Sequence, residues 1–206
     1  MSPDAARLIL ASASQRREEL LRQLGVPFTV VPSELPEDLP PGSPVEAVRA
    51  LALAKARAVG ARIGAGVILG ADTIVVLGGT VFGKPRDPGD ARLMLRALRG
   101  RLHEVVTGVA LVDAPGRREV SEAVVTRVRM AEYGEPEIEA YLATGEPYDK
   151  AGAYAIQGAG GRLVADVDGC YTNVVGLPVT TTRRLLVELG VIGREHPPAS
   201  GCAIRS

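Results

Sequence analysis

The length of the strand-like segments is the feature that most constrains the fold of this chain. Residues 67–77 are apolar except for Asp72 and Thr73 at the centre, and residues 104–112 and 120–130 also have the composition of long strands. In the segment 120–130, one face carries Val124, Thr126, Val128 and Met130, and the other carries Arg127 and Arg129. The sequence therefore predicts a sheet built on long strands.

Helical and strand patterns alternate along the chain, which predicts an α/β fold. The pair Asp168-Gly169 lies between two short strand-like runs, an arrangement typical of a β-hairpin. Because a hairpin joins antiparallel strands, a purely parallel sheet is excluded and a mixed sheet is expected. The shorter strands are predicted at 8–11, 26–31, 163–167 and 171–175, and the helices at 15–24, 43–59, 87–98, 135–144 and 178–189.

Composition limits the domain organisation and the class of partner. No linker divides the chain, so we expect one domain over residues 1–193 and a flexible tail at 194–206. Basic and acidic residues are equal in number, 24 of each, which argues against a nucleic-acid polymer as partner. No apolar run approaches the ~18 residues of a membrane span and no signal-peptide pattern opens the sequence, so we expect a soluble, cytoplasmic protein. Two cysteines and two histidines are too few for a thiolate or histidine-rich metal site.

Residues 12–17, Ser-Ala-Ser-Gln-Arg-Arg, lie where a predicted strand ends and a predicted helix begins. Backbone N–H groups at a helix start attract anions, and the hydroxyl and guanidinium groups of this segment add donors that suit phosphate oxygens. Alternatively, Ser14 only caps the helix and both Arg16 and Arg17 are solvated. The residues alone leave both interpretations open.

Asp72 and Thr73 interrupt the most apolar of the long strands. A carboxylate with apolar neighbours on both sides is costly to bury unless it is paired or binds a metal. The alternative is that the strand breaks at this point and Asp72 caps a turn. The apolar flanks favour a functional carboxylate.

Only three of the 24 basic residues are lysines, and each lies near other candidate residues. Lys55 lies on an apolar helical stripe and is expected to point inward, although a lysine that snorkels to the surface is the commoner arrangement. Lys84 lies in a turn after the strand 67–77, and Lys150 lies in a glycine-rich loop, 148–161, that contains Gln157. The stripe consists of Val45, Val48, Ala52, Lys55 and Val59.

The remaining motifs, present and absent, limit the classes of reaction that this chain could catalyse. An acidic loop at 32–38 has carboxylates that suit a hard cation, or it is simply a solvated loop. Neither G-x-S-x-G nor H-E-x-x-H occurs, which argues against a serine hydrolase of that type and against a zinc protease. The groups that remain are carboxylates, lysines and arginines, and this set suits a metal-assisted reaction on a phosphate-bearing substrate.

Taken in order, these motifs resemble those of the Maf family over about residues 7–190. The resemblance implies an elongated mixed β-sheet flanked by helices, akin to the fold of inosine triphosphate pyrophosphatases, and a cytoplasmic homodimer. The matching segments are Ser-Ala-Ser-Gln-Arg-Arg at 12–17, Glu37, Lys-Ala at 55–56, Gly-Ala-Asp-Thr at 70–73, Gly-Lys-Pro at 83–85 and Lys-Ala-Gly-Ala-Tyr-Ala-Ile-Gln at 150–157.

The resemblance also implies an activity. It is that of a nucleoside triphosphate pyrophosphatase, which releases a nucleoside monophosphate and pyrophosphate with a divalent cation, Mg²⁺ or Mn²⁺. Residues 150–157 are similar to the subfamily that acts on dTTP and UTP, with modified pyrimidine nucleotides as further candidate substrates, and not to the one that prefers 7-methyl-GTP. The alternative is a non-catalytic nucleotide-binding regulator of septum formation and cell division, which would need the phosphate-binding residues but not a reactive Asp72.

Matched motif by motif, the resemblance assigns roles to individual residues. Asp72 is the expected catalytic base, with Lys55 and Lys84 completing the catalytic site, and a metal is expected between Glu37 and Asp72. Arg16, Thr73 and Gln157 are the positions expected to select the substrate. The full set expected to bind substrate is Ser14, Arg16, Arg17, Thr73 and Gln157.

Overall fold

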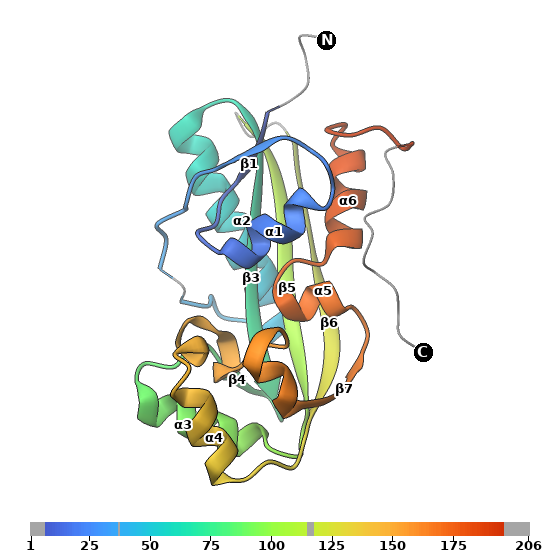
Figure 1. Cartoon of the computed structure of the whole chain (residues 1–206). Helices are drawn as coiled ribbons and strands as arrows, with labels where there is room; N and C mark the ends of the chain where they lie inside the picture. The colour runs from blue at the N-terminus through green and yellow to red at the C-terminus, as the bar shows by residue number, and fades with distance from the viewer. Residues whose placement is uncertain (1–6, 37, 115–117, 196–206) are drawn as a thin grey trace.

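The computed structural model describes residues 7–36, 38–114 and 118–195, and in these ranges seven strands form one mixed sheet (Figure 1). The order is β2-β1-β3-β5-β6-β7, and β4 pairs with part of β3. β1 is parallel to β2 and β3, and the other pairs are antiparallel, which confirms the predicted mixed α/β fold. The strands are β1 (Leu8–Leu10), β2 (Phe28–Val30), β3 (Gly66–Leu77), β4 (Thr80–Phe82), β5 (Leu102–Ala114), β6 (Arg118–Met130) and β7 (Val164–Asp168).

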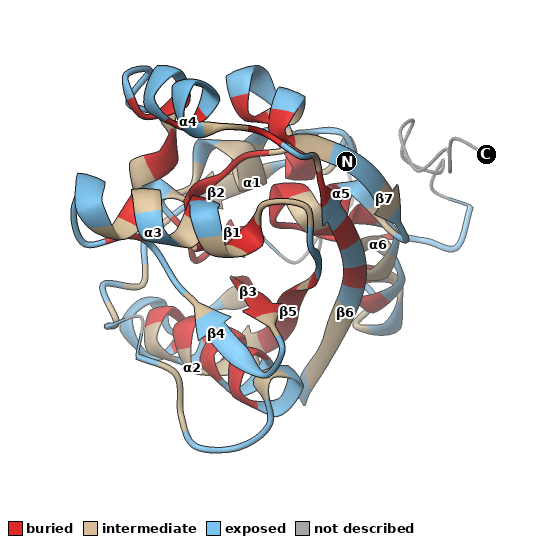
Figure 2. Ribbon diagram, turned by 90° about the horizontal axis from the view of Figure 1, so that it is seen from below, coloured by how far each residue is buried: buried red, intermediate tan, exposed pale blue. Residues whose placement is uncertain are grey.

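Helices lie on both faces of this sheet (Figure 2). In the part of the chain that the structure describes, no helix combines the length and the apolar composition needed to cross a membrane. The helices are α1 (Gln15–Arg22), α2 (Pro44–Ile63), α3 (Pro88–Leu98), α4 (Glu135–Leu142), α5 (Tyr171–Val175) and α6 (Val179–Glu188), with short 3₁₀ helices η1 (Glu146–Asp149), η2 (Ala151–Ala153) and η3 (Gly158–Leu163).

The long strands β3, β5 and β6 run almost the full length of the molecule (Figure 1). Their length confirms the prediction from the apolar segments, and the alternation expected in β6 is also present: Val128 is buried while Arg127 and Arg129 are exposed. In Figure 2, β6 shows this pattern as alternating red and blue.

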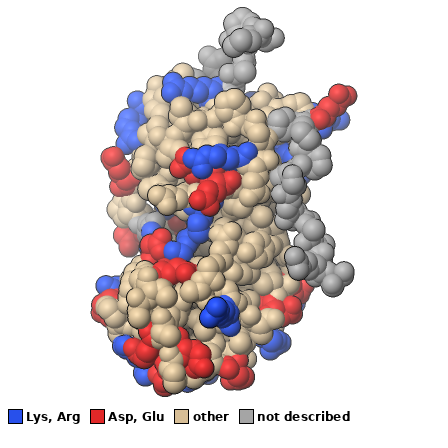
Figure 3. Space-filling model, in the orientation of Figure 1, with Lys and Arg blue, Asp and Glu red and all other residues tan. Residues whose placement is uncertain are grey.

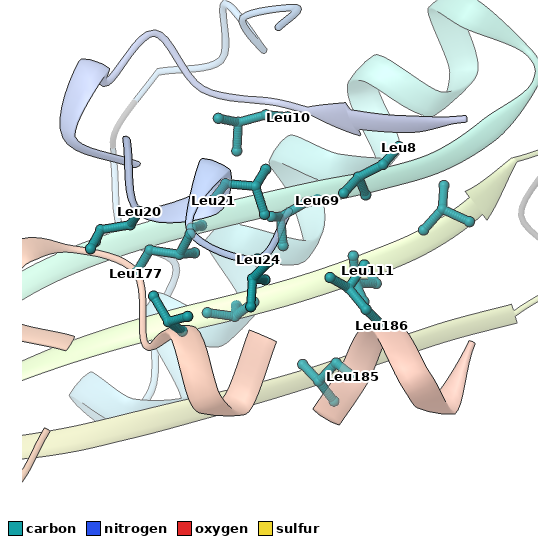
Figure 4. Close-up of a cluster of buried hydrophobic side chains, with 14 of the residues drawn as sticks. Leu8, Leu10, Leu20, Leu21, Leu24, Leu69, Leu111, Leu177, Leu185 and Leu186 are labelled. Carbon is teal, nitrogen blue, oxygen red and sulfur yellow. The ribbon is translucent and has the colours of Figure 1, made fainter. Parts of the chain in front are cut away.

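Two buried clusters lie at opposite ends of these strands. In the first, leucines from β1, β3 and β5 face α1 and α6 (Figure 4). In the second, Val75 of β3 and Val105 of β5 pack against residues of α3 and α4. Because side chains alternate across a strand, Ile9 and Ile68 point to the opposite face, where they pack against α2.

The hairpin predicted around Asp168-Gly169 is wrong, because its second strand does not form. Residues 171–175 form the helix α5, and β7 pairs with β6 instead. The reason is Asn173, which is fully buried: its side-chain amide donates to Val105 O and to Thr126 Oγ1, both at 3.0 Å. A strand at this point would carry that amide away from both acceptors.

The end of α2 and the residues that follow β3 also differ from the sequence prediction. α2 begins at the predicted Ser43 capping box but continues through Gly60 and ends at Gly64, whose φ is +77°. Gly60 therefore lies inside the helix, where it packs against Ile68. The glycine pair 78–79 forms the predicted turn, and the short strand β4 that follows it was not predicted.

Candidate active site

One edge of β3 is shared by two short strands that leave a gap between them. β1 pairs with residues 67–69 and ends there, while β4 pairs with residues 75–77. Asp72 and Thr73 lie in the gap, where neither strand covers β3. The chain leaving β1 leads into the segment 12–17, and the chain leaving β4 leads to Lys84, so both predicted motifs converge on these two residues.

A cleft of about 960 Å³ opens over this gap. Eight of the residues predicted for the site line it: Ser14, Arg16, Arg17, Lys55, Asp72, Thr73, Lys84 and Gln157. Basic and acidic side chains lie side by side on the face between the two ends of the molecule (Figure 3). Glu37, predicted as a metal ligand, lies outside the described residues, although Glu34 and Asp38 on either side of it line the cleft.

Asp72 is buried and forms an ion pair with Lys55, whose Nζ donates to Asp72 Oδ1 at 2.6 Å. β3 continues without a break through Asp72, so the alternative of a turn is wrong. Lys55 points inward as predicted, because Val48, Ala52 and Val59 of its stripe are buried, although Val45 at the start of α2 is exposed.

Glycine allows this pairing because it lets α2 pack directly on the sheet. Gly108 of β5 is the register partner of Asp72, and a Cβ on Gly108 would lie 2.4 Å from the carbonyl oxygen of Val48. A Cβ on Gly70 would lie 2.2 Å from the carbonyl oxygen of Ala52. Both distances are far inside van der Waals contact, so any larger residue would push α2, and Lys55 with it, away from Asp72.

Ser14 and Arg17 prove to be structural as well as cleft-lining. Ser14 is the N-cap of α1, as one interpretation expected. The Arg17 guanidinium donates to Gly176 O at 2.9 Å, to Ser12 Oγ at 3.2 Å and to Thr73 Oγ1 at 3.1 Å. Arg17 therefore ties α1 to β3 and to the end of α5, and it is not a solvated arginine.

The hydroxyl of Thr73 has a defined direction. Thr107 Oγ1 donates its proton to Asn173 O at 3.0 Å, so in the 3.0 Å bond between the two threonines Thr73 must donate. Thr73 in turn accepts from Arg17. Its hydroxyl proton is thus used within the protein, and Thr73 can offer a ligand only a lone pair or its methyl group.

Arg16 lies in a different environment from Arg17. Burial lowers the pKa of its guanidinium below the ordinary value, and the charges of Asp149, Tyr141 and Glu146 offset only part of this shift. Its Nε is buried and has no hydrogen-bond partner among the described residues. Arg16 therefore faces the acidic side of the cleft with part of its donor capacity unused.

Two neighbouring loops complete the wall opposite α1. The turn that carries Lys84 is anchored where Gly152 N donates to Gly83 O at 3.0 Å, and Gly152 adopts a φ of +69° that favours glycine. Lys150 Nζ donates to Glu146 O at 3.1 Å and pairs with Asp149. Glu146 and Asp149 also line the cleft, and sequence reasoning missed both because no pattern distinguishes them from surface acids.

The fold and the cleft together define an α/β protein with a cleft lined by charged side chains over a buried carboxylate. The chain belongs to the Maf-like protein family, whose model matches residues 7–189. A dTTP/UTP pyrophosphatase of Moorella thermoacetica is 53% identical over 190 residues, 90% of this chain and 96% of the relative. One from an Anaeromyxobacter species is also 53% identical, over 90% of this chain and 91% of the relative. A crystal structure of a nucleoside-triphosphatase / dITP/XTP pyrophosphatase from Mycobacterium abscessus covers 89% of this chain and 98% of its own, at 18% identity and a TM-score of 0.46.

Proposed function

We propose that this protein hydrolyses nucleoside triphosphates, with dTTP and UTP as its preferred substrates, to the nucleoside monophosphate and pyrophosphate. The names of its relatives support this activity. The observation that carries the proposal is the Lys55–Asp72 pair at the floor of a cleft whose walls hold Arg16 and Lys84. A positioned carboxylate with basic side chains beside it suits the hydrolysis of a phosphoanhydride, which needs a base for the water and cations for the phosphates.

The cations of the cleft neutralise the phosphates of the substrate. Arg16 and Lys84 would contact phosphate oxygens, and the first N–H groups of α1 would add further donors. Ser14, the N-cap of the same helix, also lines the cleft and would contact the substrate there. We assign Arg17 to the support of this wall, because its guanidinium is bonded to three groups of the protein.

Asp72 would act as the general base on a water molecule. The water oxygen forms a bond to the α-phosphorus, its proton passes to Asp72, and the bond from the α-phosphorus to the bridging oxygen breaks to release pyrophosphate. Lys55 would fix the orientation of the carboxylate through its bond to Oδ1, and Oδ2 would accept the proton of the water. General-base catalysis of this kind contributes about 10²–10⁴-fold to the rate.

The donor set fits a hard divalent cation. Mg²⁺ takes oxygen ligands, usually one or two carboxylates together with substrate phosphates and water. Within the described ranges no group of three histidine, cysteine or acidic residues forms a dedicated metal cage. Asp72, with Glu37, would hold Mg²⁺ or Mn²⁺, and the bound ion would neutralise charge on the phosphate oxygens.

Base selection is assigned to Gln157, Arg16 and Thr73. Gln157 is exposed at the cleft and its amide can both donate to and accept from a pyrimidine edge. Gln157→Ala should therefore reduce discrimination between pyrimidine and purine triphosphates more than it reduces the rate on either. An unchanged order of substrates would remove Gln157 from the base pocket.

A pyrophosphate-release assay over a panel of nucleotides, with and without Mg²⁺ or Mn²⁺, tests the activity, the metal requirement and the base preference. In the same assay Asp72→Asn should lower kcat by at least about 100-fold, because the amide cannot accept the proton. Affinity for dTTP should stay within about threefold, because the amide keeps the shape of the carboxylate. Near-normal release by Asp72→Asn would refute its role as base.

The same panel addresses the alternative function. A non-catalytic regulator of septum formation would bind nucleotides and release no pyrophosphate from any of them. The position of Asp72 in an open gap beneath the cleft favours the enzyme. We further propose a cytoplasmic homodimer, for which sedimentation equilibrium of the full chain is the direct measurement of assembly.

A further inference from the structure

One pair of side chains, Tyr141 and Glu146, bonds to the backbone on both sides of Gln157. Before Gln157, the Tyr141 hydroxyl accepts from Ala155 N at 3.0 Å. After it, the Glu146 carboxylate accepts from two successive N–H groups. The two side chains are also joined, because the Tyr141 hydroxyl donates to Glu146 Oε1 at 3.1 Å. The backbone arc that carries Gln157 is thus closed by one tyrosine–glutamate bond.

The fit between this pair and the arc is close. Glu146 accepts from Ala159 N at 3.1 Å and from Gly160 N at 3.3 Å. A Cβ on Gly158 would lie 2.8 Å from Glu146 Oε2, and a Cβ on Gly160 would lie 2.6 Å from the Tyr141 hydroxyl. Two glycines therefore let the arc lie directly against both polar groups.

The pair itself is firmly placed. Tyr141 belongs to α4 and its ring is packed in the buried cluster at that end of the sheet. Burial raises the pKa of the Tyr141 phenol, so the hydroxyl stays protonated and able to donate. Glu146 begins η1, where its own N–H donates to Thr144 Oγ1 at 3.2 Å. Its negative charge also acts on Arg16, together with that of Asp149.

From this geometry we propose that Glu146 and Tyr141 are positioning residues for substrate selection: they hold the arc 155–160 so that Gln157 meets the nucleobase. The inference rests on the proposed function. It gives two residues that were not predicted for the site a role in selecting the nucleobase, because they hold the arc that carries Gln157. Neither residue needs to touch the substrate. Their effect passes through the placement of Gln157.

Two conservative variants test the inference. Glu146→Gln keeps the size of the side chain but turns an NH₂ group toward the N–H donors of the arc, and Tyr141→Phe removes the bond to Ala155 N. Because Glu146→Gln loses charge-assisted hydrogen bonds that hold the arc, we expect KM for dTTP and UTP to rise about 10-fold or more in this variant. The preference over dGTP should fall to a similar extent, while kcat changes by less than about threefold.

Matched controls come from the same region. Tyr148→Phe removes a hydroxyl that donates to Leu142 O, and Glu139→Gln removes the ion pair with Arg92 on the outer side of α4. Both should leave KM and the order of substrates unchanged. Far-UV circular dichroism checks that each variant is folded, and Tyr141→Phe carries the test if Glu146→Gln does not fold.

A double-mutant cycle decides whether the effect passes through Gln157. In a Gln157→Ala background, Glu146→Gln should cause little further loss of discrimination, because the group that it positions is already absent. Additive losses, an unchanged order of substrates, or a fall in kcat alone would each overturn the inference. If the wild-type protein hydrolyses no nucleotide, the proposed function fails. The inference is then tested by measuring, with calorimetry and without metal, the affinities of the same variants for dTTP and dGTP.

Discussion

At the scale of single residues, removal of the Lys55 ammonium would leave Asp72 charged and buried without this partner. Breaking a buried ion pair from one side costs about 3–5 kcal/mol of unfolding free energy. We therefore expect Lys55→Met to lower the free energy of unfolding by that amount, measured in urea, and to abolish most pyrophosphate release.

Removing both charges separates stability from catalysis. The double variant Lys55→Met/Asp72→Leu should regain most of the lost stability, because apolar residues replace a buried ion pair at little net cost. It should nevertheless remain inactive. A Lys55→Met variant as stable as the wild type would show that the pair is not buried as described.

His103 gives the protein a pH-dependent stability. Burial lowers its pKa to about 4, from about 6.5 in an unfolded chain, and its Nε2 lies 2.7 Å from the Tyr154 hydroxyl. Between these two pH values the unfolded chain binds one more proton than the folded protein. Stability is therefore complete above pH 6.5 and falls as the pH drops toward 4, by about 1.4 kcal/mol per pH unit.

Urea unfolding at pH 7.5, 6 and 5 measures this slope. His103→Gln keeps a hydrogen-bonding side chain but cannot bind the proton, so its unfolding free energy should change less over the same range. Carboxylates whose pKa is already lowered, such as Glu119 and Glu135, lose their ion pairs only at lower pH. Parallel curves for the two proteins would contradict the assignment to His103.

At the scale of elements, the contact between α2 and the sheet is the sensitive interface. Gly108→Ala would place a methyl carbon 2.4 Å from the carbonyl oxygen of Val48, and backbone atoms on both sides cannot yield cheaply. Overpacking of this kind costs about 1–3 kcal/mol. We expect lower stability and reduced activity together, because the helix that is displaced carries Lys55.

The matched control for this substitution is Gly193→Ala. A Cβ on Gly193 meets nothing within 4 Å, so the change in unfolding free energy should stay within about 0.5 kcal/mol. If Gly108→Ala behaved like Gly193→Ala in both stability and activity, the close packing of α2 on β5 would not be what places Lys55.

At the scale of the whole molecule, β3 and β5 join the two buried clusters. Leu69 and Val109 belong to the first cluster, and Val75 and Val105 of the same two strands belong to the second. Since one cluster cannot lose its strands without disturbing the other, we expect the two ends to unfold in a single transition.

The tyrosines report on this directly, because the chain has no tryptophan. Tyr133, Tyr141 and Tyr154 are buried in the second cluster, so near-UV circular dichroism follows that end, whereas far-UV circular dichroism follows the whole chain. The two thermal transitions should coincide. An earlier loss of the tyrosine signal would show that α3, α4 and the 3₁₀ helices unfold separately.

The fold class and the inward positions of Asp72 and Lys55 could be predicted from the sequence. Apolar runs identified β3 and β5, because a strand buried on both faces must be apolar throughout, and alternation of apolar and charged residues identified β6. The carboxylate at the centre of the β3 run had to be paired or to bind a metal, and it is paired with Lys55. The helical stripe placed Lys55 on the inner side of α2. These inferences depend only on spacing and polarity along the chain, and a sequence carries both.

Which groups come into contact could not be predicted from the sequence. The split edge of β3 brings together the chain leaving β1 and the chain leaving β4, and no local pattern records that two short strands share one edge. Asn173 makes 171–175 a helix through hydrogen bonds to residues more than 40 positions away. Glu146 resembles any surface acid until η3 folds against it. Contacts between residues distant in sequence depend on how elements pack, and periodicity within one element cannot specify that packing.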